Sequence, residues 1–183
     1  MALNLVPKFT NRSLLLVLVL SMTTFSGIAS GSKEFKETNM SMYLHDFISG
    51  PNVTDIPVAG VAGKLWTFSQ FGSFYVTDNP LTEGPSLHSP AVGRAQGVFV
   101  ASALDGLSAL IVFSVRFTNK EYNGSTIEIQ GNSILMEPVR ELSVVSGTGK
   151  FRFARGYATC EFYSVDTPAG YAVVRLNITV EHR

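Results

Sequence analysis

Residues 92–118 read VGRAQGVFVASALDGLSALIVFSVRFT, and this stretch decides the fold class. Asp105 and Gly106 separate two apolar runs, and an Asp-Gly pair between alternating hydrophobic residues is a strong signal of a β-hairpin. In the second run one face of a strand collects the apolar side chains Ala109, Ile111, Phe113, Val115 and Phe117. In the first run the odd positions around Phe99 are small: Gly93, Ala95, Gly97, Ala101 and Ala103. Small residues there allow either a closely packed layer or space for a ligand.

The rest of the chain continues the strand pattern. Further strands are expected over residues 40–48, 64–68, 72–77, 125–130, 139–145, 151–162 and 171–181, joined by turns rich in Gly, Pro and Asn. The motif Asp78-Asn79-Pro80 is expected to end one of them. No stretch shows sustained helical periodicity. The pattern predicts an all-β protein, and the small face of the hairpin favours an eight-stranded antiparallel barrel with room for side chains or one small ligand.

The N-terminal segment differs from the rest. Lys8 and Arg12 precede a short apolar run, and small residues follow it, which is typical of a secretion signal over residues 1–30. Its apolar run is too short to span a bilayer. The polar residues 31–39 are expected to form a flexible arm, and residues 40–183 one barrel domain. The chain is therefore expected to be secreted.

Composition narrows the classes of partner. Lysine plus arginine and aspartate plus glutamate number 14 each, without a block of like charge, which argues against nucleic acid or a membrane surface. Charged residues make up 15% of the chain, which indicates that an oligomer hides surface or that glycans cover it. Four sequons lie beyond the signal, at Asn39, Asn52, Asn123 and Asn177.

Most sequence motifs that would indicate a metal, cofactor or phosphate site are absent. The histidines lack metal-ligand spacing, no dinucleotide fingerprint occurs, and Gly147-Thr148-Gly149-Lys150 is incomplete as a phosphate loop, so neither a metal nor a cofactor is expected. Cys160, the only cysteine, lies in a strand-like run without a local histidine and is expected to be a small buried side chain.

Two charged residues fall on otherwise apolar faces of predicted strands. Asp46 shares its face with Leu44 and Ile48, so burial is expected to raise its pKa and to suit it as a proton donor. Arg140 shares a face with Leu142 and is expected to point inward. The two could form a buried ion pair or a functional pair, and the sequence leaves both open.

Five blocks of the chain resemble the plant dirigent family in order and spacing. They are residues 43–46 (YLHD), 76–80 (VTDNP), 93–97 (GRAQG), 140–149 (RELSVVSGTG) and 151–159 (FRFARGYAT). The resemblance covers residues 40–180 and implies a barrel of the allene oxide cyclase type, secreted to the apoplast or cell wall as a homo-oligomer, a dimer or a trimer. It also implies binding of small phenolic substrates or their radicals.

The resemblance carries over to single positions. Asp46 and Arg140 match a pocket aspartate and a pocket arginine, and are expected to be the proton donor and its electrostatic partner. Asn132 stands where lignan-directing members have a second acid, and Phe99 and Ala101 stand where they have tyrosines. Phe162 is a further candidate contact. These departures, with the missing cysteine pair, place the chain in a divergent branch that includes pterocarpan synthases.

Two functions follow as expectations from the resemblance. The first is stereoselective coupling of phenoxy radicals of the coniferyl alcohol type, giving optically active lignans, with a separate oxidase or laccase making the radicals. The chain would then orient and not oxidise. The alternative is dehydration of an isoflavanol to a pterocarpan through a quinone methide. A third possibility is a structural or lignin-patterning role in the cell wall.

Overall fold

The computed structural model describes residues 34–183, of which residues 35–183 form one compact unit. The expected signal at residues 1–30 and the first part of the expected arm lie outside the described residues. The elements are β1 (Lys36–Phe47), β2 (Asp55–Ala59), β3 (Phe74–Thr82), β4 (Ala91–Val100), β5 (Ser108–Phe117), β6 (Thr126–Ile134), β7 (Arg140–Thr148), the 3-10 turn η1 (Gly149–Phe151), β8 (Arg155–Asp166) and β9 (Tyr171–His182).

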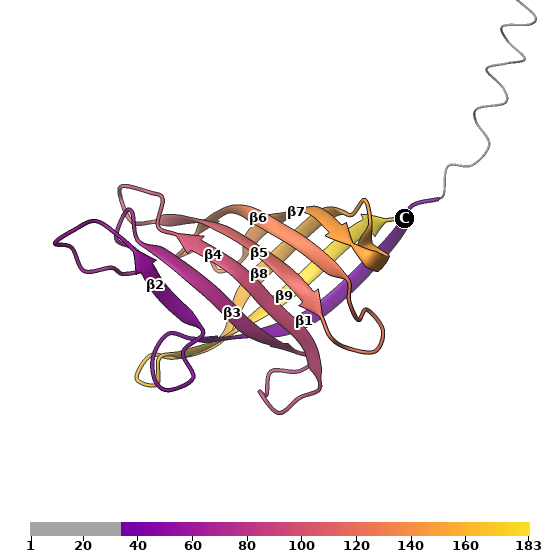
Figure 1. The fold of residues 1–183 in the computed structure, drawn as a ribbon, viewed down its shortest axis with the longest axis horizontal. Coiled ribbons are helices and arrows are strands. Elements are labelled where there is room, and N and C mark those ends of the chain that lie inside the picture. The colour runs from indigo at the N-terminus through magenta and orange to yellow at the C-terminus, as the bar shows by residue number, and fades with distance from the viewer. Residues whose placement is uncertain (1–33) are drawn as a thin grey trace, which may run out of the picture. The chain divides into compact units, whose positions relative to one another are not determined.

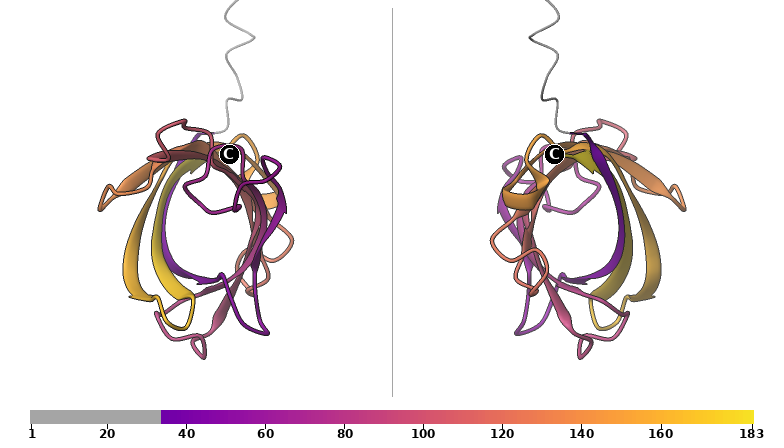
Figure 2. Two further views of the ribbon diagram at one scale, coloured as in Figure 1. Left: turned by 90° about the vertical axis from the view of Figure 1, so that its left-hand side faces the viewer. Right: turned by 90° about the vertical axis from the view of Figure 1, so that its right-hand side faces the viewer.

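The strands form one antiparallel sheet in the order β1-β9-β8-β7-β6-β5-β4-β3-β2 (Figure 1). β1 also pairs with β3 through Tyr43 opposite Thr82 and Leu44 opposite Leu81, so the sheet closes on itself. Eight strands make the ring, which Figure 2 shows from both ends, and β2 lies beside β3 as an additional strand. The predicted eight-stranded antiparallel barrel is confirmed.

The hairpin of residues 92–118 is β4 and β5, paired from Gly93 opposite Phe117 to Val100 opposite Leu110. Its small face serves both purposes that the sequence left open. A Cβ on Gly97 would lie 2.1 Å from the carbonyl oxygen of Val112, so that glycine is required by close backbone approach. Ala95, by contrast, borders a cavity.

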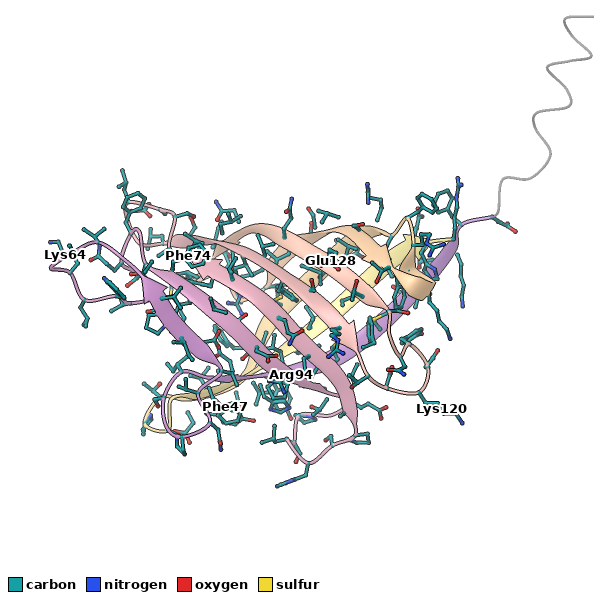
Figure 3. The ribbon with its side chains drawn as sticks, in the orientation of Figure 1. Phe47, Lys64, Phe74, Arg94, Lys120 and Glu128 are labelled. Atoms are coloured by element: carbon teal, nitrogen blue, oxygen red, sulfur yellow. The ribbon has the colours of Figure 1, made fainter. Side chains whose placement is uncertain are left out.

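Alternation along the strands separates an apolar interior from a polar outer surface. Arg94 and Glu128 lie on the outer face of β4 and β6 (Figure 3). Arg94 forms an ion pair with Asp78, and Ser114 donates a hydrogen bond to Glu128.

The interior is filled at the end of the barrel that holds η1. Phe151 of η1 is fully buried and packs on Phe117 and Tyr122, with ring centroids 5.3 and 5.0 Å away. Buried aliphatic side chains surround them: Met42, Val115, Ile127, Ile129, Ile178 and Val180. This end therefore supplies most of the hydrophobic stabilisation.

Several strand predictions are wrong, including the start of the strand expected at residues 151–162, which begins at Arg155. Residues 36–39 of the expected arm belong to β1, because they pair with the end of β9, beginning with Lys36 opposite His182. Residues 64–68, expected to form a strand, are a loop. β3 does not stop at Pro80 but runs to Thr82. Pro80 is tolerated because β2 pairs only as far as Thr77 and β1 only from Leu81, so no neighbouring strand needs its missing N–H.

Candidate functional site

The other end of the barrel contains a cavity of about 420 Å³. Its mouth is bordered by Asp166 at the end of β8, by Gly170 of the β8–β9 turn and by Met136 of the β6–β7 loop. The deeper walls come from strands on all sides and are mostly apolar: Leu44, Phe99, Ile111, Phe113, Leu142, Cys160 and Val174. This size and lining suit a small, largely apolar molecule.

Two of the three carboxyl groups that line this cavity come from the end of β1 and the start of β2. Asp46 lies on the inner face of β1, as its position among apolar residues predicts. Two hydrogen bonds between Thr54 and Phe47, which we call the clasp, close the connecting loop. The N–H of Thr54 donates to the carbonyl of Phe47 at 2.8 Å, and the hydroxyl of Thr54 accepts from the N–H of Phe47 at 3.0 Å. Asp46 and Asp55 flank this clasp, which brings them together.

Asp55 carries the pKa shift expected of a buried acid. It is 5% exposed. Burial first, and then a hydrogen bond with Asp46 and the charge of Asp46, raise the pKa of Asp55 to about 9, although hydrogen bonds with Asn79 and Thr54 act in the opposite direction. Asp55 is therefore protonated at neutral pH and can donate a proton. The sequence gives no sign of this burial, because Asp55 lies between the predicted strands 40–48 and 64–68, where no alternating pattern assigns it to an inner face.

Arg140, the first residue of β7, lines the same cavity. Its guanidinium carbon lies 4.3 Å from the ring centroid of Phe162 on β8, a cation–π contact. Burial lowers the pKa of Arg140, and its neighbours Cys160 and Asp46 partly offset the effect. Within the described part of the chain, Arg140 and Asp46 form no ion pair within 4.0 Å, so a plain buried salt bridge does not account for them.

Several buried polar atoms around the cavity lack a hydrogen-bond partner. They are Oδ1 of Asp46, Oδ2 of Asp55, Oδ1 of Asn79 and Nε of Arg140. Buried polar groups in folded proteins are nearly always paired, and leaving one unpaired costs roughly 1–3 kcal/mol. A proton on Asp55 supplies one missing donor. A polar ligand in the cavity would satisfy the others.

Of the other residues expected to contact a substrate, two line the cavity and two do not. Phe99 and Phe162 both line the cavity. The placement of Asn132 there is wrong, because it faces outward opposite the exposed Leu110, and Ser133 lines the cavity instead. Ala101 is also not a cavity residue. It lies beyond the end of β4, where its N–H and carbonyl bond to Ser73 and Gly72.

Cys160 also lies at the cavity wall. Burial raises its pKa to about 11, and the charge of Arg140 only partly opposes this, so the side chain is a neutral thiol at pH 7. A thiol in that state is a poor nucleophile. Its role is to fill the wall, as expected.

A chain of buried hydrogen bonds, which we call the relay and which the sequence did not indicate, lies behind the mouth of the cavity. Nε2 of His45 lies 2.7 Å from the hydroxyl of Thr82, which itself donates to the carbonyl of Gly84. Nε2–H is therefore the donor to Thr82, and Nδ1 accepts from the hydroxyl of Tyr171 at 2.6 Å. Burial lowers the pKa of His45, which keeps the imidazole neutral. The relay fixes the ring of Tyr171 as part of the cavity wall.

The four sequons lie on the outer surface in different settings. Asn39, Asn52 and Asn123 are exposed. Asn177 is half-buried, and its amide nitrogen lies 3.4 Å from the hydroxyl of Thr159. Asn39 and Asn177 stand on neighbouring strands, each opposite the hydroxyl residue of the other sequon.

Residues 34–183 contain no group of three or more His, Cys, Asp or Glu side chains placed to hold a metal ion. No helix in this part of the chain is long and apolar enough to cross a membrane.

The closed barrel has an apolar cavity and a buried pair of carboxyl groups at one end, and the cavity has room for a small ligand. The chain belongs to the dirigent family, whose model, "Dirigent-like protein", matches residues 37–181.

Its relatives include pterocarpan synthase 1 of Glycine max, 40% identical over 176 residues that cover 94% of each chain. Dirigent protein 1 of Arabidopsis thaliana is also 40% identical, over 93% of this chain and 90% of the relative. The solved pterocarpan synthase dirigent protein GePTS1 is 42% identical and superposes with a TM-score of 0.75, covering 84% of this chain and 88% of its own.

Proposed function

We propose that this chain dehydrates a phenolic benzylic alcohol of the isoflavanol type through a quinone methide held in the cavity. The observation that carries the proposal is the pair Asp46 and Asp55, in which a buried carboxyl group with a pKa raised to about 9 holds a proton beside a second carboxyl group. Loss of a hydroxyl group as water needs such a proton donor. Likeness to pterocarpan synthases adds support.

The proposed steps balance in atoms and charge. Asp55 donates its proton to the benzylic hydroxyl, the C–O bond breaks, and water leaves. The phenolic O–H of the substrate gives its proton to Asp46, which leaves a neutral quinone methide. A second phenol oxygen of the same molecule then attacks the benzylic carbon and returns its proton to Asp55, while Asp46 returns the first proton to the quinone methide oxygen. Both carboxyl groups end as they began.

Arg140 and the aromatic walls orient the intermediate in this scheme. The guanidinium lies over Phe162, and its unpaired Nε can donate to an oxygen of the bound molecule. The apolar walls exclude water, which would otherwise add to the quinone methide. No oxidant is required.

Stereoselective coupling of two phenoxy radicals is the second candidate, and a specific feature favours it. The cavity offers two separate aromatic surfaces. Phe99 packs edge-on against Phe68 and Tyr75, with centroids 5.2 and 5.9 Å away, whereas Phe162 lies under Arg140. Two surfaces could hold two rings, with a separate oxidase supplying the radicals.

One assay separates the two candidates. Purified protein is given an isoflavanol without an oxidant, and separately coniferyl alcohol with a laccase, and products are resolved by chiral chromatography. We expect release of pterocarpan and water in the first reaction. Optically active lignans in the second reaction, with no turnover in the first, would replace dehydration by coupling.

The variant Asp46→Asn tests the acid pair directly. We expect it to fold and be secreted but to lose activity, because the amide cannot accept the phenolic proton. The matched control is Asp78→Asn, a change of equal size on the outer surface, where the side chain pairs with Arg94. Full activity in Asp46→Asn would remove the residue from its role.

We propose in addition that the chain is secreted to the cell wall, carries glycans on its exposed sequons, and assembles as a homo-oligomer. The outer face of β3 to β5 supports assembly, because Val76 and Val112 are 46% and 36% exposed on it. Light scattering of the purified glycoprotein, before and after deglycosylation, tests both points.

A further inference from the structure

A second hollow, which we call the arginine cleft, lies at the end of the barrel opposite the mouth of the cavity. It measures about 480 Å³ and is lined by Phe35, Ser146, Gly147, Arg152, Phe153, Arg155 and Arg183. The C-terminus and the start of β1 lie at this end, whereas the β8–β9 turn lies at the other (Figure 1). The cleft therefore shares no residue with the phenol-binding cavity.

The cleft is rich in unpaired positive charge. Three of its seven lining residues are arginines, and none is acidic. Across residues 34–183, none of the three guanidinium groups comes within 4.0 Å of a carboxylate oxygen. Glu181 stands opposite Arg155 in the β8–β9 ladder without forming an ion pair.

Two of the three arginine side chains, those of Arg155 and Arg183, are held in place although they lack acidic partners. Arg155 donates to the backbone carbonyls of Val145 and Ala154. The guanidinium of Arg183 lies over two rings, 4.5 Å from the centroid of Phe35 and 5.7 Å from that of Phe153. A cleft whose donors are already positioned loses less entropy when an anion binds.

Phe153 adds a backbone feature that packing does not explain. Its φ is +65°, a left-handed conformation that residues other than glycine rarely adopt, and it is the one non-glycine residue with positive φ in the described chain. The ring is nevertheless 62% exposed, whereas Phe151 two residues earlier is fully buried. A strained backbone that presents an exposed ring at a cleft is a pointer to binding.

We propose that the arginine cleft binds an acidic polysaccharide, one whose sugar rings carry uronate carboxylates. Guanidinium groups bind carboxylates through paired, charge-assisted hydrogen bonds. Exposed phenyl rings give an apolar surface on which the C–H face of a pyranose ring can pack.

The shape of the cleft favours a polymer over a small acid. Every arginine and both phenylalanines that line it are exposed, so the cleft cannot enclose a ligand as a small-molecule site does. Several cations along an open surface match a chain with repeated carboxylates. Nucleic acid would call for a broader basic surface, but this chain has no net charge. Such binding would hold the barrel on the wall matrix with its cavity facing away.

Affinity electrophoresis of the full, secreted protein tests the proposal, with galacturonan as the probe. De-esterified galacturonan should retard the protein, and methyl-esterified galacturonan, which lacks the charge, should not. Added salt should weaken the binding because these charges are exposed. Equal retardation by both polymers, or equal retardation by polyglutamate, would overturn the saccharide assignment.

Paired variants locate the binding. Arg152→Gln and Arg183→Gln should each weaken binding about tenfold, the expected loss for one charge-assisted contact. The control is Arg116→Gln, which removes the same charge from an exposed position on β5 and should change affinity less than about twofold. An equal loss in the control would mean that only overall charge matters, and the cleft would not be a site.

Phe153→Gly separates a binding role from a structural one. Glycine adopts positive φ without strain, so the variant should melt no lower than the wild type. Its affinity for de-esterified galacturonan should nevertheless fall, because the ring is gone. Unchanged affinity would remove Phe153 from the site. Since the assay contains no phenol, its outcome is independent of the proposed dehydration.

Discussion

At the end of the barrel that holds η1, aromatic and aliphatic side chains fill the interior around Phe117 and Phe151, whereas the end beneath the β8–β9 turn is hollow around Asp46 and Asp55. The same eight strands of the ring build both ends. At the filled end the largest side chains are buried completely. At the hollow end, buried polar atoms lack partners.

This difference shows that the two ends of one small barrel contribute to different properties, the filled end to stability and the hollow end to the candidate site. Apolar burial at the filled end stabilises the closed sheet, and that stability permits an unfilled cavity with a strained acid pair at the other end. If the division is correct, matched substitutions at the two ends should affect different quantities.

The largest expected effect on stability comes from Phe151→Ala. Removing a fully buried phenylalanine should lower the free energy of unfolding by about 3–5 kcal/mol. The matched change Phe162→Ala, at a residue 50% exposed beside the cavity, should cost less than about 1.5 kcal/mol and instead lower activity. Urea unfolding of both variants measures this. Equal losses of stability would contradict the division between the ends.

The next effect is on catalysis, in Asp55→Asn. An amide cannot donate the proton that the leaving hydroxyl needs, so kcat/KM should fall by about 10²-fold or more. Steady-state kinetics on the isoflavanol measures it, and Asp78→Asn, on the outer surface where the side chain pairs with Arg94, is the control. A fall of only a few-fold would assign the proton to another group.

The same residue should shape how stability depends on pH. Because the pKa of Asp55 is raised to about 9, the folded state holds one more proton than the unfolded state between the ordinary carboxyl range and pH 9. Stability of the wild type should therefore fall as pH rises through that window. In Asp55→Asn this slope should be smaller and stability at neutral pH higher. Thermal melts from pH 5 to 9 test the sign, and parallel curves for both proteins would refute the shift.

The smallest effect should come from Asn132→Ala. The side chain faces outward from β6, so activity should change by less than about twofold. Ser133→Val, one position along and inside the cavity, should lower affinity for the substrate because it fills space and removes a hydroxyl group. A larger effect at Asn132 than at Ser133 would mean that the substrate binds outside the barrel.

Much of the fold could be predicted from the sequence because its signals are local. The hairpin around Asp105 and Gly106 and the two-residue alternation of β5 and β9 lead directly to the barrel. The errors lie where a distant strand decides the outcome. Residues 36–39 form a strand only because the end of β9 offers its backbone, and Pro80 is tolerated only because its neighbours leave a gap.

The site was less accessible to sequence reasoning. Asp46 and Arg140 could be placed inward because each shares a face with apolar residues. Asn132 was misplaced because correspondence between family positions does not reveal which face of β6 points inward. Asp55 carried no local signal, since its burial depends on the clasp between Phe47 and Thr54.

By itself, the sequence determined that this protein is an all-β barrel with an apolar interior, because alternation and turn chemistry act between residues close in the chain. Only the tertiary structure decided which acid holds the proton. A pKa depends on burial and on charges that come near through folding, and Asp55 meets Asp46 only once the loop between β1 and β2 has closed.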